Sequence, residues 1–157
     1  MSRRPITKAG YESLMKELKR LKERERPLII REIEAARAHG DLSENAEYTA
    51  AKEQQGYIEA KISDLEHRLS MAEIIDTATL PRDKIVFGTN VRVVNLETDE
   101  EKTFKLVGPD EADIDEDKIS VFSPLGSALL GKIPEDVVEV NAPRGIIEYE
   151  ILDIMFE

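Results

Sequence analysis

The sequence predicts an α+β chain of two domains: an N-terminal antiparallel α-helical coiled-coil hairpin, followed by a small antiparallel β-sheet domain with one short helix. Two observations lead to this prediction. Apolar residues recur at heptad spacing through the first half of the chain, whereas apolar and polar residues alternate from Ile85 onward. We therefore expect a coiled-coil domain over residues 1–76, a linker over 77–84 and a sheet domain over 85–157.

The first long helix has marked ends and an irregular middle. Thr7 can cap its start, and Gly40 suits the left-handed residue that follows its end. Its apolar positions form two runs, Tyr11, Leu14, Leu18 and Leu21, then Ile29, Ile33 and Ala36. The spacing slips after Glu25, with Pro27 inside the slip. Because proline removes a helix hydrogen bond and clashes with the preceding turn, we expect a kink or a stutter near Pro27.

The second long helix returns along the first. Its seam positions alternate in steps of three and four: Tyr48, Ala51, Gln55, Ile58, Ile62, Leu65, Leu69 and Ala72. Paired antiparallel, Leu14 faces Leu69 and Ile33 faces Ala51, so the two residue numbers in a pair always sum to 83 or 84. One hairpin folding on itself requires such a constant sum. This favours a monomer, with a rod of roughly 50 Å at the rise of an α-helix.

The second half contains the elements of a small sheet. The linker carries Leu80-Pro81-Arg82-Asp83, a turn-forming sequence. Strands are expected at residues 90–96, 102–107, 119–122, 136–140 and 145–156, mostly antiparallel. Ser123 can cap a short helix with Pro124 at its first position, and that helix ends before Gly131.

The acidic segment 110–117 superficially resembles a calcium-binding loop. It lacks the glycine at the sixth position and the glutamate at the twelfth that an EF-hand loop requires. A solvated acidic loop is therefore favoured over a specific cation site.

Composition limits the classes of function. The net charge is −11, divided as −1 over residues 1–79 and −10 over residues 80–157, which disfavours autonomous nucleic-acid binding. The absence of cysteine excludes disulfides and thiolate chemistry, and two histidines are too few for a histidine-rich metal centre. No apolar run of about 18 residues and no signal-peptide pattern is present, so a soluble cytoplasmic protein without a membrane partner is expected.

The turn between the two long helices is acidic, and two explanations compete for it. Asp41 and Glu44 have the spacing of a capping box, and Ser43 is a further candidate cap, so the acids could serve only to start a helix. Alternatively, two carboxylates three residues apart could hold a hard divalent cation, because Mg²⁺ commonly takes one or two carboxylates together with substrate phosphates. Spacing alone favours the cap.

The segment from Gly40 to Tyr48 resembles the tip motif of the GreA/GreB family of bacterial transcript cleavage factors. The resemblance covers the whole chain and continues, in order, through these segments: Arg26-Pro27-Leu28-Ile29-Ile30, Glu53-Gln54-Gln55-Gly56, Ile85-Val86-Phe87-Gly88, Ile119-Ser120-Val121 and Ser123-Pro124 to Leu130-Gly131-Lys132. It implies that the sheet domain is FKBP-like and docks at the rim of the RNA polymerase secondary channel. The coiled coil would then enter that channel.

The resemblance also implies a site that the partner completes. Asp41 and Glu44 match the family's catalytic carboxylates and would hold the second Mg²⁺ of the polymerase site jointly with RNA polymerase, with no metal bound tightly by the isolated chain. The outcome would be endonucleolytic cleavage of backtracked nascent RNA near its 3′ end, which generates a new 3′ end and rescues arrested complexes. The chain itself would be an accessory factor rather than an enzyme, since the tip has too few ligands to fix two metals.

Other positions matching the family are less specific. Arg37 and Lys52 match a small basic patch that contacts RNA, although each could be a solvated surface charge, and Lys52 stands where arginine is common. Ser43, Asn45 and Tyr48 belong to the tip motif, with Tyr48 also on the heptad seam. The remaining match is in the sheet domain, where the expected polymerase-docking residues are Ser123, Pro124 and Leu125.

Two other classes compete with this prediction. A non-cleaving inhibitor or regulator of the same family would fill the same channel, but its known branch has additional acids at the tip, whereas Leu42 and Ser43 separate Asp41 from Glu44 here. A prolyl isomerase or chaperone would suit an FKBP-like domain. Isomerase pockets of that fold are lined by aromatic residues, and this chain has no tryptophan and four phenylalanines.

Overall fold

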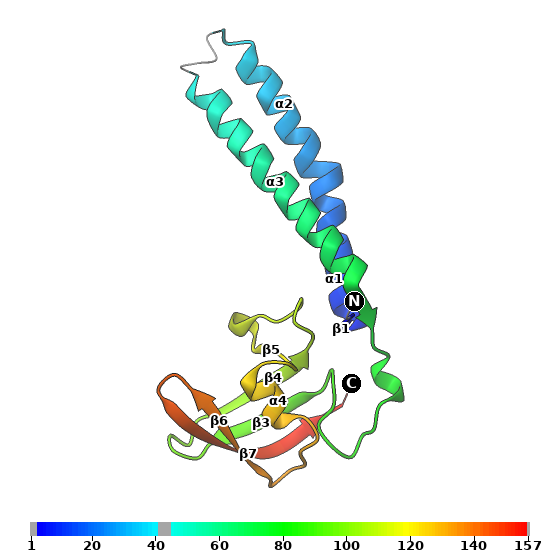
Figure 1. Ribbon diagram of the computed structural model, residues 1–157, viewed down its shortest axis with the longest axis vertical. Coiled ribbons are helices and arrows are strands. Elements are labelled where there is room, and N and C mark those ends of the chain that lie inside the picture. The colour runs from blue at the N-terminus through cyan, green and yellow to red at the C-terminus, as the bar shows by residue number, and fades with distance from the viewer. Residues whose placement is uncertain (1–2, 41–44, 157) are drawn as a thin grey trace. The chain divides into compact units, whose positions relative to one another are not determined.

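A computed structural model describes residues 3–40 and 45–156 of the 157-residue chain. Figure 1 shows two long antiparallel helical arms and a curled β-sheet. The helices are α1 (Lys8–Arg20), the π-helical segment η1 (Leu21–Glu25), α2 (Arg26–Arg37), α3 (Ala46–Met71) and α4 (Pro124–Leu129), with 3₁₀ turns η2 (Thr77–Thr79) and η3 (Ile114–Glu116). The strands are β1 (Arg4–Ile6), β2 (Ala72–Ile74), β3 (Asn90–Asn95), β4 (Glu101–Val107), β5 (Lys118–Ser120), β6 (Val137–Ala142) and β7 (Gly145–Met155). None of the described helices is long and apolar enough to cross a membrane.

The chain forms two compact units. One comprises residues 11–71, the helical hairpin, and the other comprises residues 1–10 together with 72–157. The first ten residues therefore group with the sheet, although sequence analysis assigns them to the coiled-coil domain. The reason is a pair of short strands, because β1 pairs in parallel with β2.

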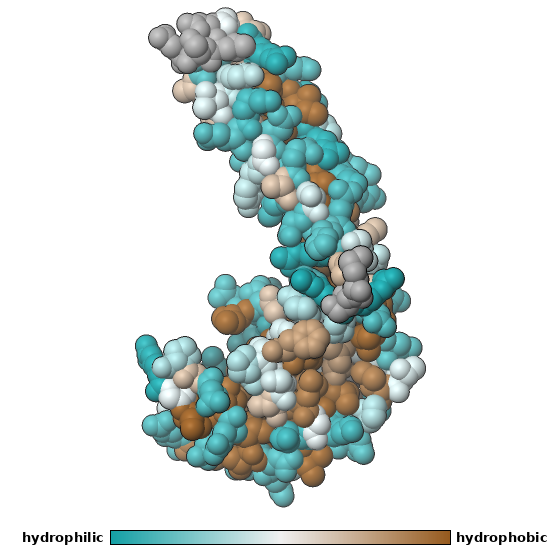
Figure 2. Space-filling model, viewed as in Figure 1, coloured by the Kyte–Doolittle hydropathy of each residue, from teal (hydrophilic) through white to brown (hydrophobic). Residues whose placement is uncertain are grey.

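The hairpin is held together by the expected seam. Its core consists of Leu21, Ile29, Ile33, Ala51, Ile58, Ile62 and Leu65, with Leu14, Leu18 and Tyr48 packed against them. On the face that Figure 2 shows, the described surface of the hairpin is mainly hydrophilic. Two ion pairs join the arms across the seam, Lys22 to Glu66 and Arg26 to Glu59, each at 2.8 Å. The antiparallel coiled coil predicted from the sequence is confirmed.

The irregularity near Pro27 is a π-helical turn. Arg26 donates its backbone N–H to the carbonyl of Leu21, five residues earlier, instead of four. A turn of this kind accommodates one extra residue inside a helix. Leu21 and Ile29 are eight positions apart, one more than a heptad, yet both are buried on the seam. The stutter alternative is therefore realised, and Pro27 follows this turn directly.

The helix predicted to run through Asp76 ends earlier. The α3 helix stops at Met71, and Ala72, which the heptad pattern places on the seam, begins β2. Three-residue strands have no alternation to reveal them, and β2 forms only because β1 lies beside it. The Thr7 cap is confirmed, since Gly10 donates its backbone N–H to Thr7 Oγ1 at 3.0 Å.

The second unit is built on a five-stranded sheet in the order β5-β4-β3-β7-β6. All its pairings are antiparallel except that of β4 with β5. The α4 helix packs against β5 and β6 and contributes Leu129 to the core. That core also contains Ile85, Val91, Val93, Phe104, Leu106, Ile119, Val121, Val138, Val140 and Ile151. Along β3 and β6 the buried residues alternate with more exposed ones, in agreement with the alternation expected from the sequence.

The acidic segment 110–117 is not simply solvated. Asp113 caps η3 by accepting from the Asp115 backbone N–H at 3.0 Å, and Asp117 has a left-handed φ of 56°. At the start of the segment, the side chain of Asp110 is only 3% exposed and pairs with Arg4 at 2.8 Å. The expectation of a solvated loop is therefore wrong for its first residues.

We expect acid to weaken the hairpin through Glu59. The Arg26 guanidinium donates two hydrogen bonds to the Glu59 carboxylate, both at 2.8 Å, and this lowers the pKa of Glu59. A carboxylate whose pKa is lowered by folding stabilises the folded state at pH values above its pKa in the unfolded chain, about 4.3. That contribution is lost as the pH falls through the pKa of the folded state. The Glu17 pKa is lowered in the same sense, chiefly by its hydrogen bonds with Arg20.

The measurement is the melting temperature of the helical circular-dichroism signal against pH. At pH 7, Glu59→Gln should lower the melting temperature by about 2 °C, because an exposed ion pair contributes little. The difference from wild type should vanish below about pH 4. Glu53→Gln on the same helix is the matched control. A difference that persists unchanged at low pH would contradict this account.

Candidate functional site

The candidate site lies where the two arms of the hairpin end. The α2 helix ends at Arg37, after which the backbone N–H groups of His39 and Gly40 bond to the carbonyls of Ala36 and Arg37 at 3.2 and 3.3 Å. Gly40 has a φ of +100°, as predicted for the residue after this helix. The chain therefore leaves α2 in a tight turn, directly before the acidic motif.

Asn45 organises the start of the return arm. Its Oδ1 accepts the backbone N–H of Tyr48 at 3.1 Å, which is the bond an N-cap makes to the third helical residue. Its Nδ2 donates to the carbonyl of Ala36 at 2.7 Å, so the same side chain joins the end of α2 to the start of α3. The sequence motif includes Asn45 but does not reveal this role, although asparagine is among the preferred N-cap residues.

The two predicted carboxylates, Asp41 and Glu44, and the tip residue Ser43 lie outside the described residues. The described neighbours still bear on the choice between a cap and a cation site. Because α3 begins at Ala46 and Asn45 caps it, the capping position is filled by another residue. Among residues 3–40 and 45–156, no group of three or more acidic or histidine side chains could hold a metal ion.

A further contact joins the two arms beside this turn. His39 Nδ1 lies 3.2 Å from Glu47 Oε2, and both side chains are exposed. The predicted basic residues Arg37 and Lys52 are also exposed, on α2 and α3 respectively, with Lys52 Nζ donating to Gln55 Oε1 at 3.1 Å. Tyr48 packs against the coiled-coil core, which favours its role on the seam.

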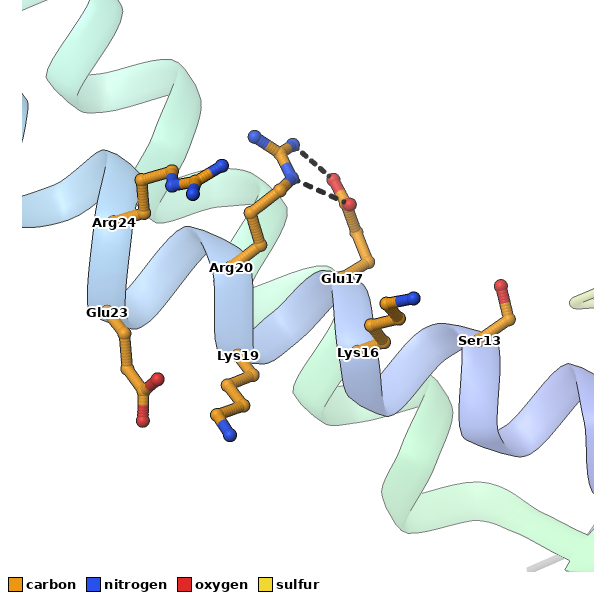
Figure 3. A pocket seen from close by; sticks show the side chains of 7 residues that line it. All are labelled: Ser13, Lys16, Glu17, Lys19, Arg20, Glu23 and Arg24. Atoms are coloured by element: carbon orange, nitrogen blue, oxygen red, sulfur yellow. Dashed lines mark hydrogen bonds and ion pairs between the residues drawn. The ribbon is translucent and has the colours of Figure 1, made fainter.

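Elsewhere on the hairpin, the exposed side of α1 and η1 carries an open hollow of about 610 Å³. Figure 3 shows its charged side chains, with Arg20 hydrogen-bonded to Glu17 through Nε at 3.0 Å and Nη2 at 2.7 Å. These hydrogen bonds also raise the pKa of Arg20. The hollow is open to solvent, and Arg20 and Glu17 within it pair with each other.

The predicted docking residues Ser123, Pro124 and Leu125 lie together on the sheet unit. They line a hollow of about 770 Å³ whose apolar walls include Phe104, Ile119 and Val140. Ser123 has a structural duty as well: its Oγ accepts the Gly126 backbone N–H at 3.0 Å and donates to the carbonyl of Ser120 at 2.7 Å. Leu125 is half-buried against the core.

Two exposed apolar side chains in this region escaped the sequence analysis. Phe122, next to Ser123, is 67% exposed, and Ile114, which lines the hollow, is 83% exposed. The alternation of Ile119 and Val121 toward the core already implied that Phe122 points outward. Ile114 was visible as a single apolar residue within an acidic loop.

Comparisons with known proteins cover the whole chain. The family model described as transcription elongation factor, N-terminal, of GreA and GreB matches residues 4–74, and the corresponding C-terminal model matches residues 80–156. The transcription elongation factor GreA of Thermodesulfovibrio yellowstonii is 52% identical over 153 residues, covering 98% of this chain and 97% of that protein. GreA of Psychrobacter arcticus is 49% identical over 158 residues, covering 100% of both chains. The crystal structure of GreA factor homolog 1 of Thermus thermophilus is 33% identical, covers 97% of this chain and 98% of that one, and has a TM-score of 0.46.

Proposed function

Because this chain belongs to the GreA/GreB family of transcription elongation factors, we propose that it inserts its coiled coil into the secondary channel of RNA polymerase and stimulates cleavage of backtracked RNA. The observation that carries the proposal is the acidic motif placed at the turn of a long, well-packed hairpin, with Asn45 capping the return helix. With the capping position filled by Asn45, the two carboxylates of the motif would not be needed as caps.

The chemistry of these carboxylates suits Mg²⁺, which prefers oxygen ligands and accepts one or two carboxylates beside waters and phosphates. Asp41 and Glu44 would supply those ligands, and the polymerase and the RNA would supply the rest. A second Mg²⁺ in such a site stabilises charge on the attacking and leaving oxygens of the phosphodiester. The hairpin itself contributes reach and rigidity, which bring the two carboxylates into a site that another protein has formed.

The sheet unit would provide the attachment. Figure 2 shows that hydrophobic side chains gather on the face of this unit turned toward the viewer. The hollow beside Ser123 combines apolar walls with exposed Phe122, the kind of anchor that dominates protein interfaces. Polymerase binding through this hollow would hold the factor while the hairpin occupies the channel.

The test uses a backtracked elongation complex with RNA labelled at its 3′ end. Wild-type factor and Mg²⁺ should release a labelled 3′ fragment, and the shortened RNA should extend again when nucleotides are added. The same factor should leave naked RNA intact. Binding to polymerase with no release of fragment would identify a non-cleaving regulator instead, and cleavage of naked RNA would identify an autonomous nuclease.

We expect Lys52 to contribute to the grip on RNA. Lys52→Ala should raise the concentration of factor needed for half-maximal cleavage, and the salt dependence of that concentration should lose about one unit of slope on a logarithmic plot. Lys52→Arg should strengthen the grip, because a guanidinium can bind a phosphate with two hydrogen bonds. Arg37→Ala should behave as Lys52→Ala does. Equal salt slopes for all four proteins would contradict an RNA-contacting role.

We expect Phe122 to be an anchor for polymerase. Phe122→Ser should weaken binding to core polymerase by about tenfold or more, since loss of an aromatic anchor typically costs over 1 kcal/mol. Ile146→Ser is the matched control, because Ile146 is 60% exposed and Phe122 67%. The measurement is a binding titration with labelled factor. Unchanged affinity for Phe122→Ser would exclude this docking surface.

A further inference from the structure

One carboxylate in the sheet unit binds two segments that are far apart in sequence. Glu111 Oε2 accepts the backbone N–H of Thr7 and that of Gly108, both at 2.9 Å, and Glu111 Oε1 accepts the hydroxyl of Thr7. Thr7 and Glu111 are separated by 104 positions. Hydrogen bonds to an ionised acceptor are about twice as strong as neutral ones. This side chain therefore ties the chain entering α1 to the turn that follows β4.

The backbone around this carboxylate is closely packed. A Cβ atom built on Gly10 would lie 2.0 Å from Glu111 Oε1, and one built on Gly108 would lie 1.8 Å from the carbonyl oxygen of Pro5. Both distances are far inside van der Waals contact. At Gly108 the neighbour is backbone, so only glycine fits there, whereas a Cβ at Gly10 would displace the Glu111 carboxylate from its hydrogen bonds. The ion pair of Arg4 with Asp110 lies in the same two segments. Charge, hydrogen bonding and shape all hold residues 4–10 against residues 108–111.

The held segment leads directly into the hairpin. Thr7 uses its hydroxyl both to donate to Glu111 and to accept the Gly10 backbone N–H that caps α1. The α1 helix then runs from Lys8 to Arg20 and, through η1 and α2, to the acidic motif. The hydrogen bonds of Glu111 reach Thr7 and Gly108, so an effect of Glu111 on the tip would pass through the root of α1.

We propose that Glu111 is a positioning residue, which fixes the root of α1 to the sheet unit and so restricts the directions in which the hairpin can present its tip. This inference rests on the proposed cleavage function for its consequence. A factor without Glu111 would still dock through the sheet unit. Its carboxylates would occupy the productive position for a smaller fraction of the time, and small misplacements of catalytic groups are costly.

The first test measures how firmly Glu111 holds the root of α1 to the sheet unit. Since the chain has no cysteine, the pair Gln54→Cys and Ile146→Cys allows one spin label on the hairpin and one on the sheet unit. Glu111→Ala should broaden the distance distribution between the labels and speed hydrogen exchange at the Gly10 amide. Glu111→Gln keeps an oxygen for the two backbone donors and should preserve both. An unchanged distribution in Glu111→Ala would overturn the proposal.

The second test separates positioning from attachment. In the backtracked-complex assay, Glu111→Ala should lower the cleavage rate at saturating factor by about tenfold, while its affinity for polymerase changes less than twofold. Glu111→Gln should restore most of the rate. A loss of affinity with an unchanged saturating rate would overturn the proposal. If wild type itself releases no fragment, the proposed function fails, and the distance and exchange measurements still decide the role of Glu111.

A double-mutant cycle gives a third measurement. Alanine is favoured over glycine inside helices, yet Gly10→Ala would push a methyl group against the Glu111 carboxylate. Gly10→Ala should therefore broaden the distance distribution in the wild-type background and have no further effect beside Glu111→Ala. Gly56→Ala is the control, because a Cβ on Gly56 meets nothing within 4 Å. Additive effects of the two substitutions on the distance distribution would contradict the proposed role of Glu111.

Discussion

The double variant Asp41→Asn with Glu44→Gln is expected to lose stimulated RNA cleavage by at least about 100-fold while it still binds polymerase. Both substitutions preserve size and remove negative charge, and amide oxygens are weaker ligands for Mg²⁺ than carboxylates. Stabilisation of a phosphoryl transition state by a metal is worth several kcal/mol, and each 1.36 kcal/mol is a factor of ten in rate. The measurement is the initial rate of 3′ fragment release at saturating factor.

A nearby acid provides the control for this experiment. Glu47 lies in the first turn of α3 and contacts His39 at 3.2 Å, outside the predicted pair. Glu47→Gln should keep the cleavage rate within about twofold, because exposed ion pairs contribute little. Single variants should regain part of their activity as Mg²⁺ is raised, since a weakened ligand set binds metal less tightly. Equal rates for wild type and the double variant would contradict the assignment of Asp41 and Glu44.

The sheet unit is expected to depend strongly on Ile151. This residue lies in β7, the strand between β3 and β6, pairs with Val93 in the ladder and is 0% exposed. Ile151→Ala removes buried methyl and methylene groups from a closely packed core, which typically costs about 2–5 kcal/mol. If the sheet unit docks on polymerase as proposed, its loss should then reduce cleavage as a secondary effect.

Hydrogen exchange at the backbone amides of β3 and β7 is the appropriate measurement, because the two units need not unfold together. In Ile151→Ala, the free energy of opening obtained from the exchange rates should fall by the amount that the lost burial costs. Ile146→Ala in the same strand is the matched control: its side chain is 60% exposed, and surface substitutions usually change stability by less than about 0.5 kcal/mol. Similar losses for the two variants would show that strand propensity, rather than burial, governs β7.

Periodicity explains how much of this fold the sequence could predict. The seam of the hairpin and the strands β3, β4 and β7 carry patterns long enough to identify their structure, and even the slip around Pro27 was visible as an eight-residue step from Leu21 to Ile29. The strands β1 and β2 were missed because each has three residues and gains its structure from the other. Such pairings depend on contacts distant in sequence, which local patterns do not encode.

The candidate site also has a part that the sequence could predict and a part that it could not. Asp41 and Glu44 could be recognised by their motif, but spacing alone favoured a helix cap. The Asn45 side chain, bonded to both Ala36 and Tyr48, provides that cap instead. In the sequence, Glu111 is one more acid in a charged loop, because no neighbouring residue indicates that Thr7 is its hydrogen-bond partner. Side chains whose role is set by distant backbone groups are the ones that sequence reasoning overlooks.

The π-helical turn in the outgoing arm sets the direction, around the helix axis, in which the end of α2 faces. Each residue of an α-helix advances its face by about 100° around the axis. If η1 were regular, Ile29, Ile33 and every later side chain of α2 would be turned by about that angle away from α3. The wider turn cancels this rotation. The five residues Leu21–Glu25 therefore determine the side of α2 on which Arg37 lies. Deleting one residue of Leu21–Glu25, so that the turn becomes regular α-helix, would preserve the direction in which Arg37 faces. A regular turn of unchanged length would rotate that direction by about 100°.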